Sequence, residues 1–314
     1  MEASKQFISI VIPVFNEEGN VEKLHKEIID VISTHDLEAE IIFVDDGSTD
    51  KTLEKLRLLS PVKVIVLRKN FKQTAAMDAG IKVARGKVII TMDGDLQNDP
   101  ADIPRLLQKL DDGYDVVSGW RKNRKDSLSK MILSRGADQL RKLLINDTIN
   151  DSGCTLKAYR AECFKGVDLY GEIHRFIPAL LKIQGFEITE IAVNHRPRVS
   201  GVTKYNYRRL LKGLLDLLSV WFWKKYANRP LHLFGGIGII LNFIGFGLLV
   251  WMFIDKVIYN LPIGNRVWPL MGIFLIILGI QFFISGLLVD ISVKTYYQTK
   301  KETPYSIKEI IKND

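Results

Sequence analysis

Short aliphatic runs separated by amphipathic segments cover the first two-thirds of the chain. The runs are rich in Ile and Val, which is typical of strands buried on both faces of a sheet. Strands are predicted at residues 7–14, 40–45, 62–67, 88–92, 114–119 and 187–193. Helices are predicted at 20–33, 51–59 and 74–84, with Asn20 as the cap of the first, and further helices start near Pro100 and Pro178. This alternation predicts an α/β domain with a Rossmann-like, mostly parallel sheet covered by helices on both faces.

Two longer apolar stretches follow near the C-terminus. Residues 231–254 and 267–289 are each long enough to cross a bilayer, which takes about twenty apolar residues. Only Lys256 and Arg266 lie between them, whereas several basic residues precede the first stretch and follow the second. This bias predicts a transmembrane hairpin with the N-terminal domain and both termini in the cytoplasm. The glycines of 235–238 lie inside the first stretch, where they indicate close helix packing.

A segment just before the first apolar stretch is amphipathic. Residues 206–223 place apolar and polar side chains on opposite helical faces, and Trp221 and Trp223 are followed by lysines. We therefore predict a helix at the membrane interface. The predicted parts are a catalytic domain at 1–205, a juxtamembrane amphipathic helix at 206–229, a transmembrane hairpin at 230–293 and a cytoplasmic tail at 294–314.

The charge of the chain is concentrated in one segment. The net charge is +8, and residues 121–142 hold eight basic and two acidic side chains. Such a segment fits anionic lipid headgroups or phosphate. Nucleic acid is not expected as a partner, because no aromatic stacking pattern accompanies the charges. The two cysteines, Cys154 and Cys163, have no metal-binding or redox spacing.

Acidic residues come at the ends of two predicted strands. Asp45 and Asp46 end the second strand, while Asp93 and Asp95 follow the fourth, with Gln97 two residues further on. Open α/β sheets bind ligands at the carboxyl ends of their strands. Paired carboxylates suit Mg²⁺ or Mn²⁺ on nucleotide phosphates. Asp and Gly are also common in turns and helix caps, so these motifs by themselves leave both interpretations open.

Four motifs occur together in the first hundred residues. They are Ile10-Val-Ile-Pro-Val-Phe-Asn-Glu-Glu18, Val44-Asp-Asp-Gly-Ser-Thr-Asp50, Arg68-Lys-Asn-Phe71 and Asp93-Gly-Asp-Leu-Gln97. In this order they resemble family 2 glycosyltransferases of the GT-A fold. The whole chain, membrane segments included, is similar to the polyprenyl-phosphate glycosyltransferases, the group that contains dolichol-phosphate mannose synthase. The resemblance implies a nucleotide-sugar donor, a divalent metal (Mg²⁺ or Mn²⁺) and a polyprenyl phosphate acceptor.

The resemblance also implies how the donor is held. Base and ribose contacts fall to Pro13, Phe15, Glu17, Asp45 and Asp46, since carboxylates accept hydrogen bonds from base N–H groups and ribose hydroxyls. Asp93, Asp95 and Gln97 are implied to bind the metal and the diphosphate. Arg198 and Lys204 belong to a segment that resembles a mobile family loop reaching the diphosphate.

For the acceptor, the resemblance implies phosphate contacts from Arg121, Arg135 and Arg175. A guanidinium group suits this role because its planar fork forms two parallel hydrogen bonds to phosphate oxygens. Asp151 resembles a family residue close to the sugar and the acceptor, where it orients one of them. Catalysis is thus assigned to Asp95, Asp151, Arg121 and Arg135. His174 fits a structural role as well as a chemical one.

Together these observations predict a glycosyltransferase of the cell membrane, and the family resemblance implies that it inverts the anomeric configuration. It moves a sugar from a UDP-sugar to a polyprenyl phosphate on the cytoplasmic leaflet, and the resemblance extends to a homo-oligomer such as a tetramer. The alternatives are a GDP-sugar donor, a glycan, protein or other lipid as acceptor, and an inactive membrane scaffold with the same fold. The identity of the sugar is not encoded in any motif that we identify.

Overall fold

The computed structural model describes residues 6–122, 149–197 without 168, 170 and 172, a few positions between 217 and 226, and then 229–262 and 267–300. The chain divides into two compact units, Met1–Val220 and Trp221–Asp314. The predicted boundaries at 205, 229 and 293 stay predictions. The described positions between 217 and 226 are helical, in keeping with the predicted amphipathic helix.

The first unit is built on a seven-stranded sheet in the order β3-β2-β1-β4-β6-β5-β7. The strands are β1 (Ile8–Val14), β2 (Ala39–Asp45), β3 (Lys63–Val66), β4 (Val88–Thr91), β5 (Val116–Trp120), β6 (Lys157–Arg160) and β7 (Ile188–Ala192). All neighbouring pairs are parallel except those made by β6, which runs antiparallel to both β4 and β5. The prediction of a mostly parallel sheet is confirmed, but β6 was not predicted.

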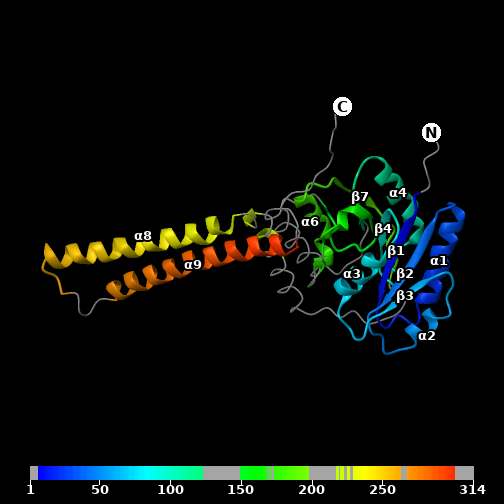
Figure 1. The fold of residues 1–314 in the computed structure, drawn as a ribbon, viewed down its shortest axis with the longest axis horizontal. Coiled ribbons are helices and arrows are strands. Elements are labelled where there is room, and N and C mark those ends of the chain that lie inside the picture. The colour runs from blue at the N-terminus through cyan, green and yellow to red at the C-terminus, as the bar shows by residue number, and fades with distance from the viewer. Residues whose placement is uncertain are drawn as a thin grey trace. The chain divides into compact units, whose positions relative to one another are not determined.

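Helices cover both faces of the sheet, as the sequence predicts (Figure 1). The α-helices are α1 (Val21–Thr34), α2 (Thr52–Leu56), α3 (Gln73–Val83), α4 (Ile103–Asp111) and α6 (Ile177–Ile183). Among the described residues, short 3₁₀ helices are η1 (Pro100–Asp102), η2 (Ala161–Phe164) and η3 (Ile173–Arg175).

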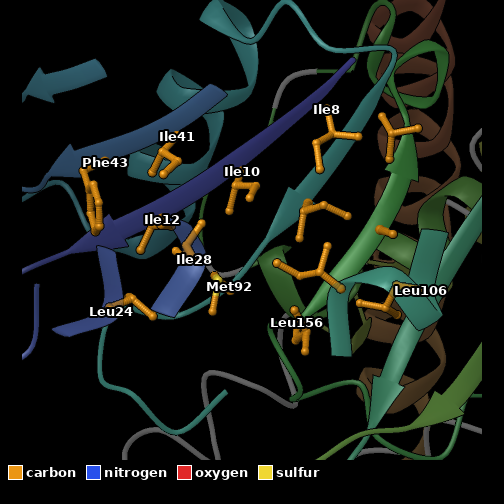
Figure 2. Close-up of a cluster of buried hydrophobic side chains, with 14 of the residues drawn as sticks. Ile8, Ile10, Ile12, Leu24, Ile28, Ile41, Phe43, Met92, Leu106 and Leu156 are labelled. Carbon is orange, nitrogen blue, oxygen red and sulfur yellow. The ribbon is translucent and has the colours of Figure 1, made fainter. Parts of the chain in front are cut away.

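Each sheet face has its own apolar core, because alternate residues of a strand point to opposite faces. On one face, Ile10 and Ile12 of β1 pack in a cluster with Leu24 and Ile28 of α1 (Figure 2). On the other face, Val11 of β1 belongs to a second cluster, with side chains of α3 and α6. The two cores fix the position of the strand ends that carry the acidic motifs.

The start of α1 differs from the prediction. Asn20 occupies the N-cap position, but its side chain makes no capping hydrogen bond. Its amide instead donates to the Glu17 carboxylate at 2.5 Å, which holds the turn between β1 and α1. Asn20 has helical backbone angles, φ −116° and ψ −32°, and not the extended conformation in which an N-cap side chain accepts its bond.

The second unit contains α8 (Pro230–Val257) and α9 (Trp268–Lys300). Both are long and apolar enough to cross a membrane, as predicted. The two helices approach each other through glycines. A Cβ atom at Gly238 would lie 2.6 Å from the carbonyl oxygen of Gly279, and one at Gly245 would lie 2.7 Å from that of Gly272. Only a residue without a side chain fits such backbone contacts, which confirms the predicted packing role for Gly238 and shows the same role for Gly245, whereas a Cβ atom at Gly236 would meet nothing within 4 Å.

Candidate active site

The turns that follow β1 and β2 are joined by side-chain hydrogen bonds. The side-chain oxygen of Asn16 accepts from the backbone N–H of Thr49 at 2.8 Å, and its own backbone N–H donates to the Ser48 hydroxyl at 3.0 Å. The backbone N–H of Glu17 donates to the Thr52 hydroxyl at 2.8 Å. These bonds fix the carboxyl ends of two neighbouring parallel strands, where an open α/β sheet binds its ligand.

A pocket of about 530 Å³ opens beside these turns. It is lined by Phe15, Asp45, Leu53, residues 47–49 and residues 66–70. Its volume is in the range of small-molecule binding sites. The pocket therefore contains two of the five residues predicted to hold base and ribose, Phe15 and Asp45.

One wall of the pocket depends on a glycine. Gly47 has φ +72°, and a Cβ atom there would lie 2.6 Å from the backbone carbon of Lys69. A side chain would thus both strain the turn and push the 68–70 segment away. Pro13 and Glu17 are not among the residues that line the pocket in the described part of the chain.

Asp46 has a structural contact that the sequence did not reveal. Its two carboxylate oxygens accept from the backbone N–H groups of Phe71 at 2.7 Å and Lys72 at 2.9 Å. Burial raises the pKa of Asp46 above its ordinary value, although both backbone bonds lower it. The carboxylate thus anchors the segment that leads into α3, and its predicted role in donor binding stays a prediction.

Lys72, held by this anchor, has a strained backbone. Its φ of 80° and ψ of 162° lie in a region that is essentially restricted to glycine and costs on the order of 1–3 kcal/mol. Its side chain is exposed. We therefore expect Lys72→Gly to stabilise the protein by about 1 kcal/mol, after the entropy cost of the added glycine is subtracted. Chemical denaturation of the purified protein measures this.

Lys165 provides the matched control for this substitution. It is exposed and has an ordinary backbone conformation, with φ −64°. Lys165→Gly is therefore expected to destabilise slightly. A lower unfolding free energy for Lys72→Gly than for the wild type would contradict the assignment of strain.

The second acidic motif follows β4. Asp95 is 5% exposed, and one of its carboxylate oxygens accepts from the backbone N–H of Gln97 at 3.1 Å. Asp93 accepts from the side-chain amide of Gln73 at 2.6 Å, and its backbone N–H donates to the side-chain oxygen of Asn98 at 3.1 Å. Both carboxylates are thus held at the carboxyl end of one strand.

These two carboxylates fit a divalent cation. Burial and then the negative charge of Asp95 raise the pKa of Asp93 to about 6. A bound Mg²⁺ or Mn²⁺ would relieve that repulsion. No cluster of three or more His, Cys, Asp or Glu side chains is found among the described residues. Asp93 and Asp95 would therefore share the ion with phosphate oxygens or water, and the Gln97 side chain remains a predicted third ligand.

The raised pKa of Asp93 means that its ionised carboxylate lowers the folding stability of the metal-free protein. Between about pH 4 and pH 6 the folded state binds more protons than the unfolded state, so ionised Asp93 lowers stability above pH 6. We expect Asp93→Asn to raise the metal-free unfolding free energy by about 1–2 kcal/mol at pH 7.5. This gain should shrink as the pH falls through 6 towards 4, which thermal unfolding at several pH values measures.

The exposed Asp112, which pairs with Lys109, serves as the control. Asp112→Asn is expected to change the unfolding free energy by less than about 0.5 kcal/mol, both at pH 7.5 and as the pH falls towards 4. A destabilising effect of Asp93→Asn at pH 7.5 would contradict the expectation that the ionised Asp93 carboxylate lowers the stability of the metal-free protein.

Arg121 and Asp151 form a bidentate ion pair, although thirty positions separate them in the chain. The Nε and Nη2 atoms of Arg121 donate to the two oxygens of Asp151 at 2.7 and 2.8 Å, and the backbone N–H of Arg121 donates at 3.2 Å. Their side chains are 14% and 13% exposed. Burial alone would lower the pKa of Arg121, but the bonds to Asp151 raise it above its ordinary value.

Two further polar residues near this site escaped the sequence analysis. Lys157 of β6 is 2% exposed and Nζ donates to the carbonyl oxygen of Ser152 at 3.1 Å. Gln73, the first residue of α3, holds Asp93. The position of Lys157 between the apolar residues Leu156 and Ala158 was the one sequence feature that could have indicated a buried lysine. Gln73 gave none, since glutamine is ordinary at a helix start.

The remaining predicted residues divide into described and undescribed positions. His174 is buried, and its Nδ1 lies 2.8 Å from the hydroxyl of Thr74, the residue after Gln73. This contact gives His174 a structural role at the start of α3. Arg175 is the next residue of η3. Arg135, Arg198 and Lys204 lie outside the described residues, so their predicted roles stay predictions.

Comparison with known families identifies the class of protein. Residues 9–167 match the family described as glycosyl transferase family 2. The chain belongs to this family, and the protein is a glycosyltransferase. The predicted resemblance is thereby confirmed.

The curated relatives narrow the class. A dodecaprenyl-phosphate galacturonate synthase of Rhizobium johnstonii is 40% identical over 96% of this chain and 92% of its own. An undecaprenyl-phosphate 4-deoxy-4-formamido-L-arabinose transferase of Edwardsiella ictaluri is 32% identical over 98% of this chain and 95% of its own. The chain is thus similar along its whole length to polyprenyl-phosphate sugar transferases.

A solved structure confirms the fold. Glucosyl-3-phosphoglycerate synthase from Mycobacterium tuberculosis, in complex with Mn²⁺, UDP and glucosyl-3-phosphoglycerate, superposes with a TM-score of 0.54. It is 16% identical, and the match covers 70% of this chain and 80% of that one. At this identity the likeness concerns the GT-A fold alone.

Proposed function

We propose that this glycosyltransferase moves a sugar from a UDP-sugar to the phosphate of a polyprenyl phosphate. The observation that carries the proposal is the near full-length similarity to two enzymes named for that acceptor class. The two relatives are named for different sugars, so the sugar is left open. A fold neighbour with UDP and the pocket beside Phe15 and Asp45 support a UDP-sugar donor.

The family resemblance implies an inverting displacement, and the described residues suggest how the reactants would be held. A phosphate oxygen of the acceptor attacks the anomeric carbon, a new carbon–oxygen bond forms there, and the bond to the nucleoside diphosphate breaks with inversion. Arg121 would hold the acceptor phosphate, so positioning supplies much of the rate enhancement. A phosphate monoester has a second pKa of about 6 and needs little help from a base. Both oxygens of Asp151 are bonded to Arg121, which supports an orienting role for this carboxylate.

A divalent ion on Asp93 and Asp95 would supply charge neutralisation for the departing diphosphate. The two apolar helices and the distribution of basic residues support a membrane enzyme that works on the cytoplasmic leaflet. A homo-oligomer such as a tetramer belongs to the same proposal and rests on the family resemblance.

A donor and acceptor panel tests the proposal. Full-length protein in detergent is incubated with Mn²⁺, farnesyl phosphate and in turn UDP-glucose, UDP-galacturonic acid or GDP-mannose, and sugar in the lipid fraction is measured. Farnesol, which lacks the phosphate, is the matched acceptor control. Transfer from one UDP-sugar to farnesyl phosphate and not to farnesol is expected. Transfer to farnesol, or nucleotide release without lipid product, would overturn the proposal that the acceptor is a polyprenyl phosphate.

A further inference from the structure

A row of polar residues crosses the sheet beside the active site. Lys157 of β6 lies between Ser118 of β5 and Thr91 of β4 in the strand register. All three are nearly inaccessible, at 2%, 0% and 1% exposure. Their nearest same-face neighbours, such as Tyr159, belong to the apolar core under α3 and α6. A lysine ammonium in such surroundings is costly to bury, so its contacts call for an explanation.

The contact of Lys157 is with the turn that carries Asp151. Nζ donates to the carbonyl oxygen of Ser152 at 3.1 Å, and the same turn is closed by a bond from the backbone N–H of Cys154 to the carbonyl oxygen of Asp151 at 3.4 Å. Burial lowers the pKa of Lys157 to about 8, against the opposing effects of Cys154, Asp151 and Asp93. At neutral pH the ammonium group therefore keeps its proton and its hydrogen-bond donors.

The same turn fixes the orientation of Arg121. Asp151 accepts from Nε and Nη2, which form one edge of the guanidinium. Gly153 allows this approach, because a Cβ atom there would lie 3.1 Å from Nη2 of Arg121. The bonds to Asp151 use two of the five guanidinium N–H groups and leave both hydrogens of Nη1 for a ligand. The turn thus decides which edge of Arg121 is left for a ligand.

We propose that Lys157 is a positioning residue for acceptor binding: it holds the turn at residues 151–154 through the Ser152 carbonyl, so that Asp151 presents the Nη1 edge of Arg121 to the acceptor phosphate. Lys157 itself does not touch either substrate. This inference rests on the proposed function, since it needs a phosphate acceptor at Arg121.

The test compares acceptor kinetics with donor binding in the same preparations. Full-length wild type, Lys157→Met, Lys157→Arg and Ser118→Ala are assayed with farnesyl phosphate and the UDP-sugar that supports transfer. Binding of UDP with Mn²⁺ is measured by calorimetry. Ser118 is the matched control, because it neighbours Lys157 in the register and its buried hydroxyl has no hydrogen-bond partner among the described residues.

We expect Lys157→Met to reduce kcat/KM for farnesyl phosphate by about 30-fold or more, with UDP·Mn²⁺ affinity within about twofold of wild type. Lys157→Arg should recover part of the loss, since it keeps a cationic donor, and Ser118→Ala should match wild type. In an Arg121→Lys background, Lys157→Met should cost much less, because residues that act through one another are not additive.

Four results would overturn the inference. Wild-type acceptor kinetics in Lys157→Met would remove any role for the ammonium. Equal loss of UDP·Mn²⁺ binding and transfer, or additive effects with Arg121→Lys, would assign Lys157 to general folding. If the wild type itself binds UDP·Mn²⁺ but never transfers to farnesyl phosphate, the acceptor proposal fails first and the inference fails with it.

Discussion

Replacing Asp95 by asparagine is expected to reduce sugar transfer by about 10³-fold or more, equivalent to roughly 4 kcal/mol of transition-state stabilisation. Asparagine keeps the shape of the side chain and an oxygen that can accept the bond from Gln97 N–H, so the fold should persist. What is lost is one of the two charges that would hold the metal against the leaving diphosphate. Initial rates at saturating donor and Mn²⁺ measure the loss.

Two controls separate this loss from unfolding. Asp112→Asn removes the exposed carboxylate at the C-cap of α4 and is expected to keep wild-type activity. Addition of Mn²⁺ should raise the thermal midpoint of the wild type and of Asp112→Asn but leave Asp95→Asn unchanged, since an ion stabilises only the state that binds it. Asp95→Asn with more than about a tenth of wild-type activity would show that this carboxylate is not a required ligand.

Asp151→Ala is expected to destabilise the first unit by about 3–5 kcal/mol and to abolish transfer, because it leaves the buried guanidinium of Arg121 without its partner. The size of the effect follows from burial, since both side chains are largely removed from water. Urea denaturation measures the stability, and the lipid-transfer assay measures the activity.

An exposed ion pair gives the matched comparison. Oε2 of Glu22 lies 2.6 Å from Nζ of Lys55, and the two side chains are 57% and 33% exposed. Glu22→Ala is therefore expected to lower the unfolding free energy by less than about 1 kcal/mol. Replacing both members of the buried pair, Arg121→Met with Asp151→Leu, should recover stability but not activity. Equal costs for Asp151→Ala and Glu22→Ala would contradict the importance of burial at the Arg121 pair.

Most of the sheet could be predicted from the sequence because its strands are continuous aliphatic runs. β6 was missed for the opposite reason: its four residues begin with Lys157 and end with Arg160, so no apolar pattern marks it. Its antiparallel direction was equally hidden. Strand direction follows from how the chain returns to the sheet, and here a long segment separates β5 from β6.

The candidate site was predictable where it follows strand ends. Asp45, Asp93 and Asp95 come directly after aliphatic runs, and the rule for open α/β sheets places them together. The pairing of Arg121 with Asp151 was not predictable, since it depends on how β6 brings the 151–154 turn back to β5. Nor did the sequence distinguish Asp45, which lines the pocket, from its neighbour Asp46, which binds backbone amides.

In the membrane enzyme proposed above, the glycine contacts between α8 and α9 would determine how the hairpin meets a bilayer. Residues 231–254 form an apolar length of about 36 Å, against a hydrocarbon core of about 30 Å. Backbones in contact at Gly238 and Gly245 cannot slide past one another without opening the contact, so in a bilayer the pair would tilt as one body. Such a hairpin would accommodate the hydrophobic mismatch by its inclination, which is expected to vary with the thickness of the membrane.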